Sequence, residues 1–321
     1  MSERCDAYHA DRVFSTLRDD GATARSAIAA SWSRSLVHYG LDPANGRPPR
    51  RLSQGEFARA FEQLDLLAGL AGGELDRLFL MAGEAGCCVM LTDADAVPLV
   101  RRGASGDDVD FRRLGLWTGM VWSEASEGTN GIGTCLAEAR ALTVHREQHF
   151  LARNIGLSCT VAPIWDAQGR LAAALDVSTC RSDLTPALLK LVAAATVEAA
   201  QRIEQRHFRA AFSHARILVA DDDRGPRGLL AVDREDLVIG ASRCARLAFG
   251  LTEQRLATPF PADDLLGRQE RADDFSAGER GVVQRAMARA RGNVSAAARM
   301  LGISRATLHR KLSRLQLDRP H

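Results

Sequence analysis

The sequence lacks any uninterrupted apolar run long enough to cross a membrane, and its first residues do not have the charged-then-apolar order of a secretory signal. These absences lead us to expect a cytoplasmic protein without a membrane partner. The chain has 321 residues, of which 46% are hydrophobic and 26% are charged. That length and composition are typical of two or three globular domains.

Cysteine is scarce, and its spacing shows no pairing. The chain has an odd number of cysteines with no CxxC pair among them. This pattern argues against a disulfide framework and against a structural zinc site, and it favours reduced thiols. The seven positions are Cys5, Cys87, Cys88, Cys135, Cys159, Cys180 and Cys244.

Lysine is almost absent, because Lys190 and Lys311 are the only lysines among 42 basic residues, and neither follows a glycine. The motif GxxxxGK[ST], whose backbone and lysine hold nucleotide phosphates, does not occur. The sequence therefore predicts no ATP hydrolysis of this type. We also expect no cofactor and no enzymatic activity. A cysteine nucleophile beside His149 would need an oriented base and an oxyanion site, and no motif indicates them.

The clearest pattern that is present lies near the C-terminal end. Asn293 can cap a helix over residues 294–301, Gly302 permits a tight turn, and Ser304 can cap a second helix over residues 305–315. Small or apolar residues are spaced to line the contact between the two helices: Ala298, Ile303, Leu308, Leu312 and Leu315. The pattern predicts a helix-turn-helix.

Charge supports DNA as the partner of this segment. From Glu279 to the end there are ten basic residues and two acidic ones, a net charge of +8, whereas the whole chain carries only +2. A local basic module of this kind is typical of a phosphate-binding surface. The alternative is a helical bundle whose basic face is merely solvated or contacts a protein. The predicted DNA-contacting residues are Asn293, Ser295, Ser304, Arg305, Thr307, His309, Arg310, Lys311 and Arg314.

The run from Glu279 through Leu312, which contains Gly-Asn-Val-Ser-Ala-Ala-Ala-Arg-Met-Leu-Gly-Ile-Ser-Arg-Ala-Thr-Leu-His-Arg-Lys-Leu, resembles the Fis-type helix-turn-helix of bacterial enhancer-binding activators. The resemblance implies that Ser304, Arg305 and Thr307 lie near bases or phosphates. It implies that His309, Arg310 and Lys311 contact the DNA backbone. The preceding amphipathic helix would help to pair two protomers through an apolar stripe, which comprises Val282, Val283, Ala286, Met287 and Ala290.

In the middle of the chain, short apolar segments bounded by turn residues follow the pattern of β-strands. Two hairpins are expected, formed by residues 87–92 with 97–101 and by residues 158–164 with 171–178. Between them we expect a Gly-rich loop, a strand at 141–144 and a helix at 147–154. The fold class is therefore α+β, an antiparallel sheet with helices packed on one face and inserted loops that roof a pocket.

Residues 84–180 resemble a GAF domain of the acetoin-catabolism activators. The motifs that carry the resemblance are Gly119, Trp122-Ser123-Glu124, Glu127-Gly128-Thr129-Asn130-Gly131-Ile132-Gly133-Thr134, His149-Phe150, Ser158-Cys159 and Ala162-Pro163-Ile164. Ser31-Trp32-Ser33-Arg34-Ser35, followed by Gly40-Leu41-Asp42-Pro43, resembles the N-terminal signature of the same activators. Its alternative interpretation is a helix, over residues 24–39, that docks on the next domain. The resemblance implies a small alcohol, ketone, aldehyde or diol as effector.

The candidate effector-binding residues are Trp117, Trp122, Glu127, Asn130, Cys135, His149 and Cys159. Buried polar groups need partners, and a small ligand could supply them. Alternatively, the tryptophans belong to the core and the glycines of residues 128–133 only permit a tight loop. His145 and His149 would allow a metal site only if both lay on one helix face, and we expect no metal.

The remaining segments link these parts. Two amphipathic helices are expected over residues 52–83. A long helix carries an apolar stripe that includes Leu188, Leu191 and Val192, which predicts a dimer-forming signalling helix. Residues 229–233, 237–240 and 242–251 resemble the core of a shortened PAS module, although Glu235-Asp236 replaces the glycine expected in its turn. The expected segments are an N-terminal helical lead-in (1–58), a GAF-like sensor (59–183), the long helix (184–212), the PAS-like remnant (213–257), a linker (258–276) and the Fis-type domain (277–321).

Activators of the resembled class carry an AAA+ ATPase domain between sensor and helix-turn-helix, and the interval of residues 213–276 is too short to hold one. The sequence thus predicts a homodimeric, effector-responsive regulator that binds double-stranded DNA without ATPase activity. The alternative is a GAF-based metabolite or redox sensor that acts through protein partners.

Overall fold

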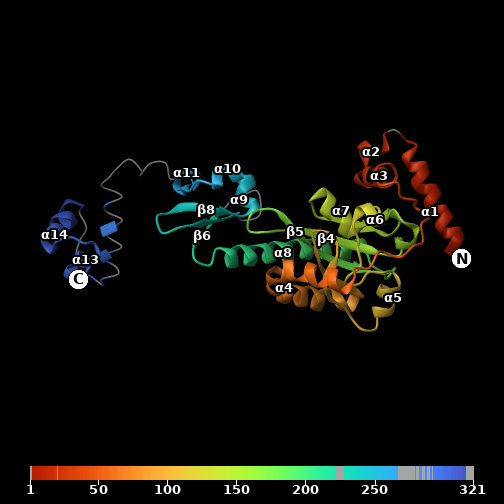
Figure 1. Ribbon diagram of the computed structural model, residues 1–321, viewed down its shortest axis with the longest axis horizontal. Helices are drawn as coiled ribbons and strands as arrows, with labels where there is room; N and C mark the ends of the chain where they lie inside the picture. Colours follow the sequence, from red (N-terminus) through yellow and green to blue (C-terminus); the bar gives the residue numbers. More distant parts are fainter. Residues whose placement is uncertain are drawn as a thin grey trace. The chain divides into compact units, whose positions relative to one another are not determined.

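The computed structural model describes residues 2–19, 21–220, 228–266, 279, 282–283, 286–287, 290 and 292–315. The chain divides into two compact units, Met1–Pro259 and Phe260–His321. Figure 1 shows the course of the chain through both. Among the described residues, no helix is both long enough and apolar enough to cross a membrane.

An antiparallel sheet of five strands forms the centre of the first unit, in the order β2-β1-β5-β4-β3. The two predicted hairpins, β1 with β2 and β4 with β5, are confirmed (Figure 1). β5 joins them, because it pairs with β1 as well as with β4. The strands are β1 (Cys87–Asp93), β2 (Pro98–Arg102), β3 (Leu142–His145), β4 (Ser158–Trp165) and β5 (Leu171–Thr179).

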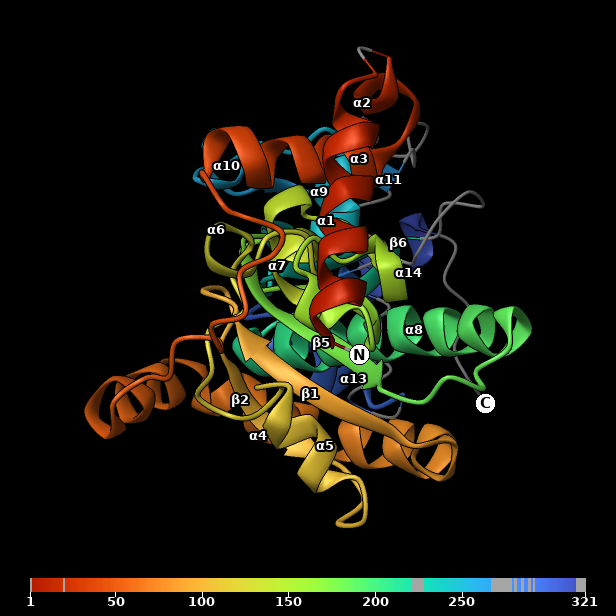
Figure 2. The same cartoon turned by 90° about the vertical axis from the view of Figure 1, so that its right-hand side faces the viewer.

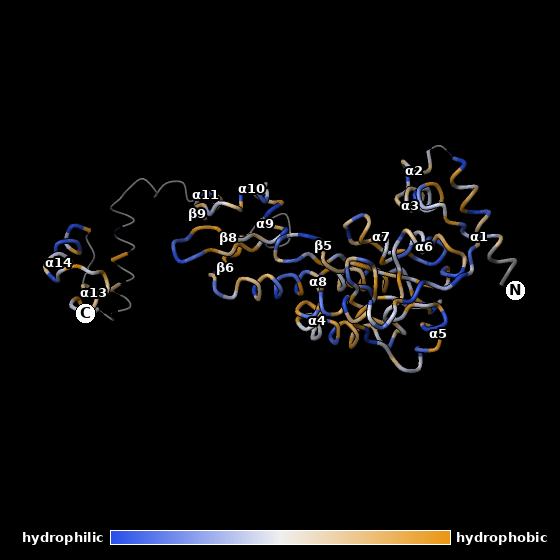
Figure 3. Tube along the Cα trace, viewed as in Figure 1, coloured by the Kyte–Doolittle hydropathy of each residue, from blue (hydrophilic) through white to orange (hydrophobic). Residues whose placement is uncertain are grey.

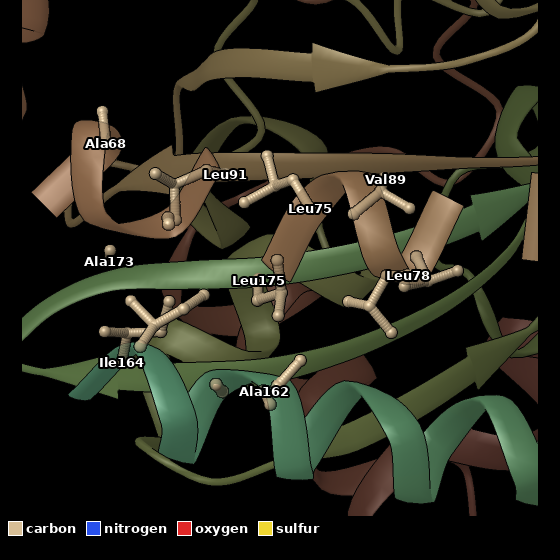
Figure 4. Packing of buried hydrophobic residues seen from close by; sticks show 14 of the residues in the cluster. Ala68, Leu75, Leu78, Val89, Leu91, Ala162, Ile164, Ala173 and Leu175 are labelled. Atoms are coloured by element: carbon tan, nitrogen blue, oxygen red, sulfur yellow. The ribbon is translucent and has the colours of Figure 1, made fainter. Parts of the chain in front are cut away.

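One face of this sheet is covered by two long helices, α4 (Gln54–Ala82) and α8 (Pro186–Ala211). Side chains alternate between the faces of a strand, so every second residue of β1, β4 and β5 points to these helices. We call the resulting cluster the helix-side core (Figure 4). Its members include Leu67, Leu75, Leu78, Val89, Leu91, Ala162, Ile164, Leu175, Val177, Val192 and Ile203.

The prediction of two helices over residues 52–83 was wrong, because α4 is continuous for 29 residues. Ser53 begins it with a reciprocal capping box to Glu56. Gly72 and Gly73 lower helix propensity but do not interrupt the helix, since the buried residues on both sides of them pack on the same sheet.

The opposite face of the sheet is covered as well, which corrects the expectation of helices on one face only. Here the short helices α5 (Asp108–Arg113) and α7 (Gly131–Glu138) and the connecting loops pack on the sheet, and α6 (Glu124–Glu127) packs against α7. Figure 2 labels the three helices. We call this cluster the loop-side core. It contains Cys88, Met90, Ala96, Phe111, Leu116, Trp122, Ile132, Cys135, Leu157, Cys159, Val161 and Ala174.

No α-helix forms over residues 147–154, so that prediction was wrong. Two 3₁₀ turns, η3 (Arg146–Gln148) and η4 (Ala152–Asn154), occupy the segment instead. Arg146 has a left-handed backbone with φ of 49°, which an α-helix cannot contain.

The N-terminal segment forms α1 (Ser2–Leu17), α2 (Ala22–Arg25), α3 (Ala27–Ser33) and a π-helical turn, η1 (Arg34–His38). The helix predicted over residues 24–39 is therefore broken into pieces. Val13 and Trp32 pack with Phe150 and Leu151. This contact anchors the N-terminal helices to the GAF-like sheet domain. A further 3₁₀ turn, η2 (Gly83–Ala85), leads from α4 into β1.

Beyond α8, a smaller antiparallel sheet contains β6 (Arg216–Ala220), β7 (Gly228–Val232) and β8 (Leu237–Ala241), followed by α9 (Arg243–Ala248) and α10 (Glu253–Leu256). β7 is buried throughout, and Figure 3 shows hydrophobic residues along these strands. Asp236 takes the left-handed conformation, with φ of 65°, in the turn where a glycine was expected. On α8, Leu191 of the predicted stripe is exposed, whereas Val192 is buried against the sheet of its own chain.

In the second unit the structure describes β9 (Phe260–Pro261), α11 (Asp263–Leu266), α13 (Val294–Met300) and α14 (Arg305–Arg314). Most of the predicted linker, residues 267–276, lies outside the described residues. The second unit has its own apolar cluster, which comprises Val283, Ala286, Met287, Ala297, Ala298, Leu308, Leu312 and Leu315.

Candidate functional sites

The helix-turn-helix is fixed by local hydrogen bonds that its sequence predicts. The side chain of Asn293 accepts a hydrogen bond from the backbone N–H of Ala296 at 3.1 Å and so begins α13. Ser304 accepts from the N–H of Thr307, also at 3.1 Å, and begins α14. Gly302 makes the turn with φ of 64°. Both caps and the turn are confirmed.

The outer face of α14 presents free cationic groups. Arg305 and Arg310 are exposed and form no ion pair within the described part of the chain. His309 is half-buried on the same helix, and Ser295 and Asn293 are exposed on or beside α13. Exposed, unpaired guanidinium groups at the start and middle of a helix are what a phosphate- or guanine-binding surface requires.

Glu279 sits against two of the predicted DNA-contacting residues. Its carboxylate pairs with the ammonium of Lys311 and with the guanidinium of Arg314. Because Glu279 is itself largely buried, it holds both cations against its own unit. Their contribution to a DNA-binding surface is thereby reduced relative to that of Arg305 and Arg310, a distinction that the sequence does not reveal.

The apolar stripe that was expected to pair protomers lies largely inside the apolar cluster of its own unit. Val283, Ala286 and Met287 are buried in the apolar cluster of their own unit, against Leu308 and Leu312. They therefore help to hold α14 in position. Among the described members of the stripe, Val282 is the exposed one.

The N-terminal signature is a docking segment. Arg34 donates through Nε and Nη2 to the two carboxylate oxygens of Glu124, at 2.6 and 2.7 Å. Ser31 donates to Glu124 and also contacts the hydroxyl of Thr129 at 2.6 Å. Thr134 donates to the same carboxylate at 3.1 Å. The two motifs that carried the resemblance, at residues 31–35 and 122–134, are therefore partners of each other.

Asn130 and Trp122, which were predicted to bind an effector, have internal partners instead. The Asn130 side chain accepts from the N–H of Gly133 and donates to the carbonyl oxygens of Trp122 and Gly128, so it caps α7. Trp122 is buried and donates to the carbonyl oxygen of Gly115. A Cβ at Gly133 would overlap the backbone of Trp122. For these residues the alternative of a tight, self-contained loop fits the contacts.

Glu127 forms a buried ion pair with Arg153. Burial raises the pKa of Glu127 to about 7, while the guanidinium of Arg153 opposes the rise. Nearby, Nε of Arg153 is buried without a hydrogen-bond partner among the described residues. Of the predicted effector residues, Glu127 thus lies beside a donor that remains unsatisfied.

His149, Cys159 and Cys135 lie in the interior and are held in neutral forms. His149 donates through Nδ1 to the carbonyl oxygen of Arg146 at 2.9 Å, and its Nε2 lies 3.6 Å from Sγ of Cys159. Burial lowers the pKa of His149 to about 4 and raises the pKa of Cys135 to about 12 and that of Cys159 further. A neutral thiol beside a weakly basic imidazole is the reverse of an activated nucleophile.

His145 and His149 do not share a helix face. His145 ends β3 and contacts the hydroxyl of Ser158 through Nδ1, at 2.7 Å, whereas His149 follows a 3₁₀ turn and is fully buried. In the described ranges, no three His, Cys, Asp or Glu side chains are grouped to hold a metal ion. A surface cavity of about 520 Å³ beside His145 is lined by Arg12, Arg146, Glu147, Gln148, Ile155 and Gly156, and by none of the predicted effector residues.

Sequence reasoning missed Arg101 and Asp176. Arg101 stacks on Trp117, with its guanidinium carbon 4.2 Å from the ring centroid, and its side chain is 9% exposed. Asp176 is fully buried on β5, where its two carboxylate oxygens share the one hydroxyl donor of Ser178, at 2.9 and 2.7 Å. The available signal was the presence of charged residues in strands that are otherwise mostly apolar: Asp176 in β5, and Arg101 beside Arg102 in β2.

Comparison with known proteins agrees with this architecture. A sequence model of the GAF domain matches residues 73–203, and one of the bacterial regulatory protein, Fis family, matches residues 278–315. The acetoin catabolism regulatory protein of Cupriavidus necator is 36% identical over 225 residues, which are 68% of this chain and 34% of that protein. This chain is a homologue of the acetoin catabolism regulators. It contains a GAF domain and a Fis-type helix-turn-helix.

Two further relatives extend the comparison. The acetoin dehydrogenase operon transcriptional activator AcoR of Bacillus subtilis is 28% identical over 183 residues, 57% of this chain and 30% of that protein. The propane 2-monooxygenase operon transcriptional activator MimR of Mycolicibacterium smegmatis is 27% identical over 180 residues, 54% and 30% of the two chains. The GAF-containing homologue described here spans about a third of the length of these curated relatives.

Among solved structures, the crystal structure of the E. coli DhaR(N)-DhaL complex contains a chain with a TM-score of 0.52 and 17% identity to this GAF-containing homologue. The match covers 74% of this chain and 80% of that one. At this identity the likeness shows that the two chains share a fold.

Proposed function

We propose that the chain is a cytoplasmic, homodimeric transcription regulator that binds a specific DNA sequence through α14 and responds to a small-molecule effector through its GAF domain. The observation that carries the proposal is that Arg305 and Arg310 are exposed and form no ion pair among the described residues. They lie on α14, a helix that is capped by Ser304 and packed into the apolar cluster of its unit. The Fis-family match and the regulator homologues support it.

We further propose that the regulator acts without hydrolysing ATP. Residues 204–277, between the GAF and Fis-family matches, contain no phosphate-binding GxxxxGK[ST] loop, and neither lysine of the chain follows a glycine. Binding of effector would instead shift the population of two states that differ in DNA affinity. The effector class implied by the homologues is a small alcohol, ketone, aldehyde or diol.

Substitution of Arg305 tests DNA recognition. Two protomers imply two half-sites about one helical turn, ~34 Å, apart. Arg305→Ala should weaken binding of a duplex from the chain's own promoter region by about 1–3 kcal/mol, with a smaller loss for an unrelated duplex. Fluorescence anisotropy on both duplexes measures the difference.

Arg299→Ala is the matched control, because Arg299 is an exposed arginine on α13 of the same module. Its removal should weaken binding to both duplexes equally. The rival function, a sensor that acts through a protein partner, predicts no sequence preference and no steep loss of affinity as salt rises. Wild-type chain that ignores the promoter duplex even at low salt would contradict the proposal.

A further inference from the structure

Arg101 is the most poorly satisfied buried cation on the loop side of the GAF sheet. Its Nη1 donates to the Asp108 carboxylate at 2.7 Å, but Nε and Nη2 are buried and have no hydrogen-bond partner among the described residues. A buried donor without an acceptor destabilises a protein, and more so when it is charged. The neighbouring aromatic rings contact the guanidinium but supply no hydrogen-bond acceptor to these two nitrogen atoms.

The unsatisfied atoms form one edge of the guanidinium group. Nε and Nη2 present parallel N–H donors, the geometry that receives both oxygens of a carboxylate. The group is held in place by the rings of Phe111 and Trp117, 5.3 and 4.2 Å from its central carbon. Gly103 leaves room for the Arg101 guanidinium itself, because a Cβ at position 103 would overlap that group. The donor edge is therefore preorganised.

The charges around Trp117 leave a positive excess. The guanidinium groups of Arg101 and Arg112 both stack on this ring, and both pair with the one carboxylate of Asp108, at 2.7 and 3.9 Å. These three residues carry a net charge of +1. A bound carboxylate would neutralise it as well as satisfy the two donors.

A second polar group lies two strands away on the same face. Met90 of β1 pairs with Arg101 of β2 on one side and with Asp176 of β5 on the other, so all three lie in one cross-strand row. Cross-strand neighbours are about 5 Å apart at Cβ, which places Arg101 and Asp176 about 10 Å apart. Asp176 has no cationic partner among the described residues, and its carboxylate contacts Ser178.

Both side chains lie close to the neighbouring row of the sheet that contains Cys88. The Arg101 guanidinium lies over Gly103, the Asp176 carboxylate accepts from Ser178, and Ser178 pairs with Cys88 in the register. Burial raises the pKa of the Cys88 thiol well above its usual value; the charge of Asp176 adds to the rise and that of Arg101 opposes it. The two charged groups therefore face the same interior region.

We propose that Arg101 binds the carboxylate of a small hydroxy or oxo carboxylic acid, and that Asp176 hydrogen-bonds the oxygen at the other end of this ligand, accepting from a hydroxyl group or, in its protonated form, donating to an oxo group. The inference rests on the proposed effector role of the GAF domain and narrows its ligand class, because it adds a carboxylate to a small oxygenated molecule. Arg101 acts as a binding residue and Asp176 as a second polar anchor. Trp117 belongs to the site through its contact with Arg101.

Matched pairs of probes test the ligand class on the full chain. Lactate is compared with propane-1,2-diol, and pyruvate with acetone, by calorimetric titration and by thermal unfolding. The acids should bind about tenfold or more tightly than their neutral counterparts, since each loses a charge-assisted, two-point contact when the carboxylate is removed.

Three variants assign the contact. Arg101→Met, whose side chain can still pack on Phe111 and Trp117, should weaken binding of the acid by about tenfold or more. Gly103→Ala, which keeps the charge but displaces the guanidinium, should weaken it in the same direction. Arg102→Met is the matched control, because the neighbouring Arg102 pairs with Asp76 and alternates to the other face of β2. It should leave binding unchanged.

The proposal is wrong if neither acid binds the wild-type chain, if the neutral probes bind as tightly, or if Arg101→Met binds the acids as well as wild type does. DNA affinity is measured on the same samples with and without the acid. Loss of DNA binding together with intact, Arg101-dependent acid binding would overturn the proposed regulator and leave the carboxylate site standing. Intact DNA binding without Arg101-dependent binding of the acids would overturn the carboxylate site alone.

Discussion

The helix side of the five-stranded sheet is filled mainly by aliphatic side chains from β1, β4 and β5 together with α4 and α8, with Cys87 among them. The loop side receives from the same strands Asp176, Cys88 and Cys159. Arg101 of β2 joins this second face. Strand alternation makes the difference possible, since neighbouring residues serve opposite faces. The helix side holds the fold together, whereas on the loop side Arg101 keeps two buried donor atoms without a hydrogen-bond partner in the part of the chain that the structure describes.

Truncation on the helix side should have the largest effect on stability. Leu75→Ala removes a fully buried side chain of α4 and should lower the free energy of unfolding by about 2–5 kcal/mol. Leu80→Ala, on the same helix but 81% exposed, should change it by less than about 0.5 kcal/mol. Urea unfolding measures both. Similar losses in the two variants would remove the basis for calling this face the structural one.

On the loop side, removing the charge of Glu124, a carboxylate that has hydrogen-bond partners, should have the next largest effect on stability. Glu124→Gln leaves Arg34 without its two-point carboxylate partner and should lower the free energy of unfolding by about 2–3 kcal/mol, less than for a fully enclosed pair because Arg34 is 31% exposed. The control is Glu138→Gln, which removes a second, 3.3 Å partner of Arg34 and should have a smaller effect. Equal effects would show that burial of Glu124 is not what matters.

Substitution of Asp176 should have an effect on stability that depends on pH. Burial raises its pKa from 3.8 to about 7, so the folded chain holds a proton that the unfolded chain has already lost between these values. The contribution of Asp176 to stability is therefore largest below pH 4 and is lost as pH rises to 7, by at most about 1.4 kcal/mol per pH unit.

Asp176→Asn should remove this dependence, so the stability of the variant relative to wild type should improve from pH 4.5 to pH 7.5. Urea unfolding at the two pH values measures the change. Asp183→Asn, which alters an exposed aspartate, should keep the difference constant. If the difference in the free energy of unfolding between Asp176→Asn and wild type is the same at both pH values, the loop side does not hold a buried carboxyl group with a raised pKa at this position.

Features set by short-range chemistry could be predicted from the sequence. Asn293, Gly302 and Ser304 act through hydrogen bonds and backbone conformations within three or four residues, and all three were predicted correctly. The two sheet hairpins were predicted for the same reason, because alternation and turn residues lie side by side in the chain. The pairing of β1 with β5 joins segments far apart in sequence, and no local pattern encodes it.

The interior site could be predicted only in part. Asn130 was expected to bind a ligand because it is polar and enclosed, but its three hydrogen bonds are made within its own loop. Arg101 was not expected, since its burial depends on Trp117 and Phe111 from a separate segment that folds over β2. Polarity in a sequence shows which residues need partners, and only the tertiary packing shows which ones lack them.

α8 is one uninterrupted helix that enters two hydrophobic clusters. Ile203 belongs to the helix-side core, and five residues later Phe208 packs with Leu229 and Ala231 beneath the smaller sheet. The helix rises about 1.5 Å and turns about 100° per residue, so its register fixes the angle between these two attachments. Inserting a single alanine between Ile203 and Phe208 would rotate the second attachment by that angle. Because α8 is continuous, the orientation of one end cannot change relative to the other unless the side chains at one end repack.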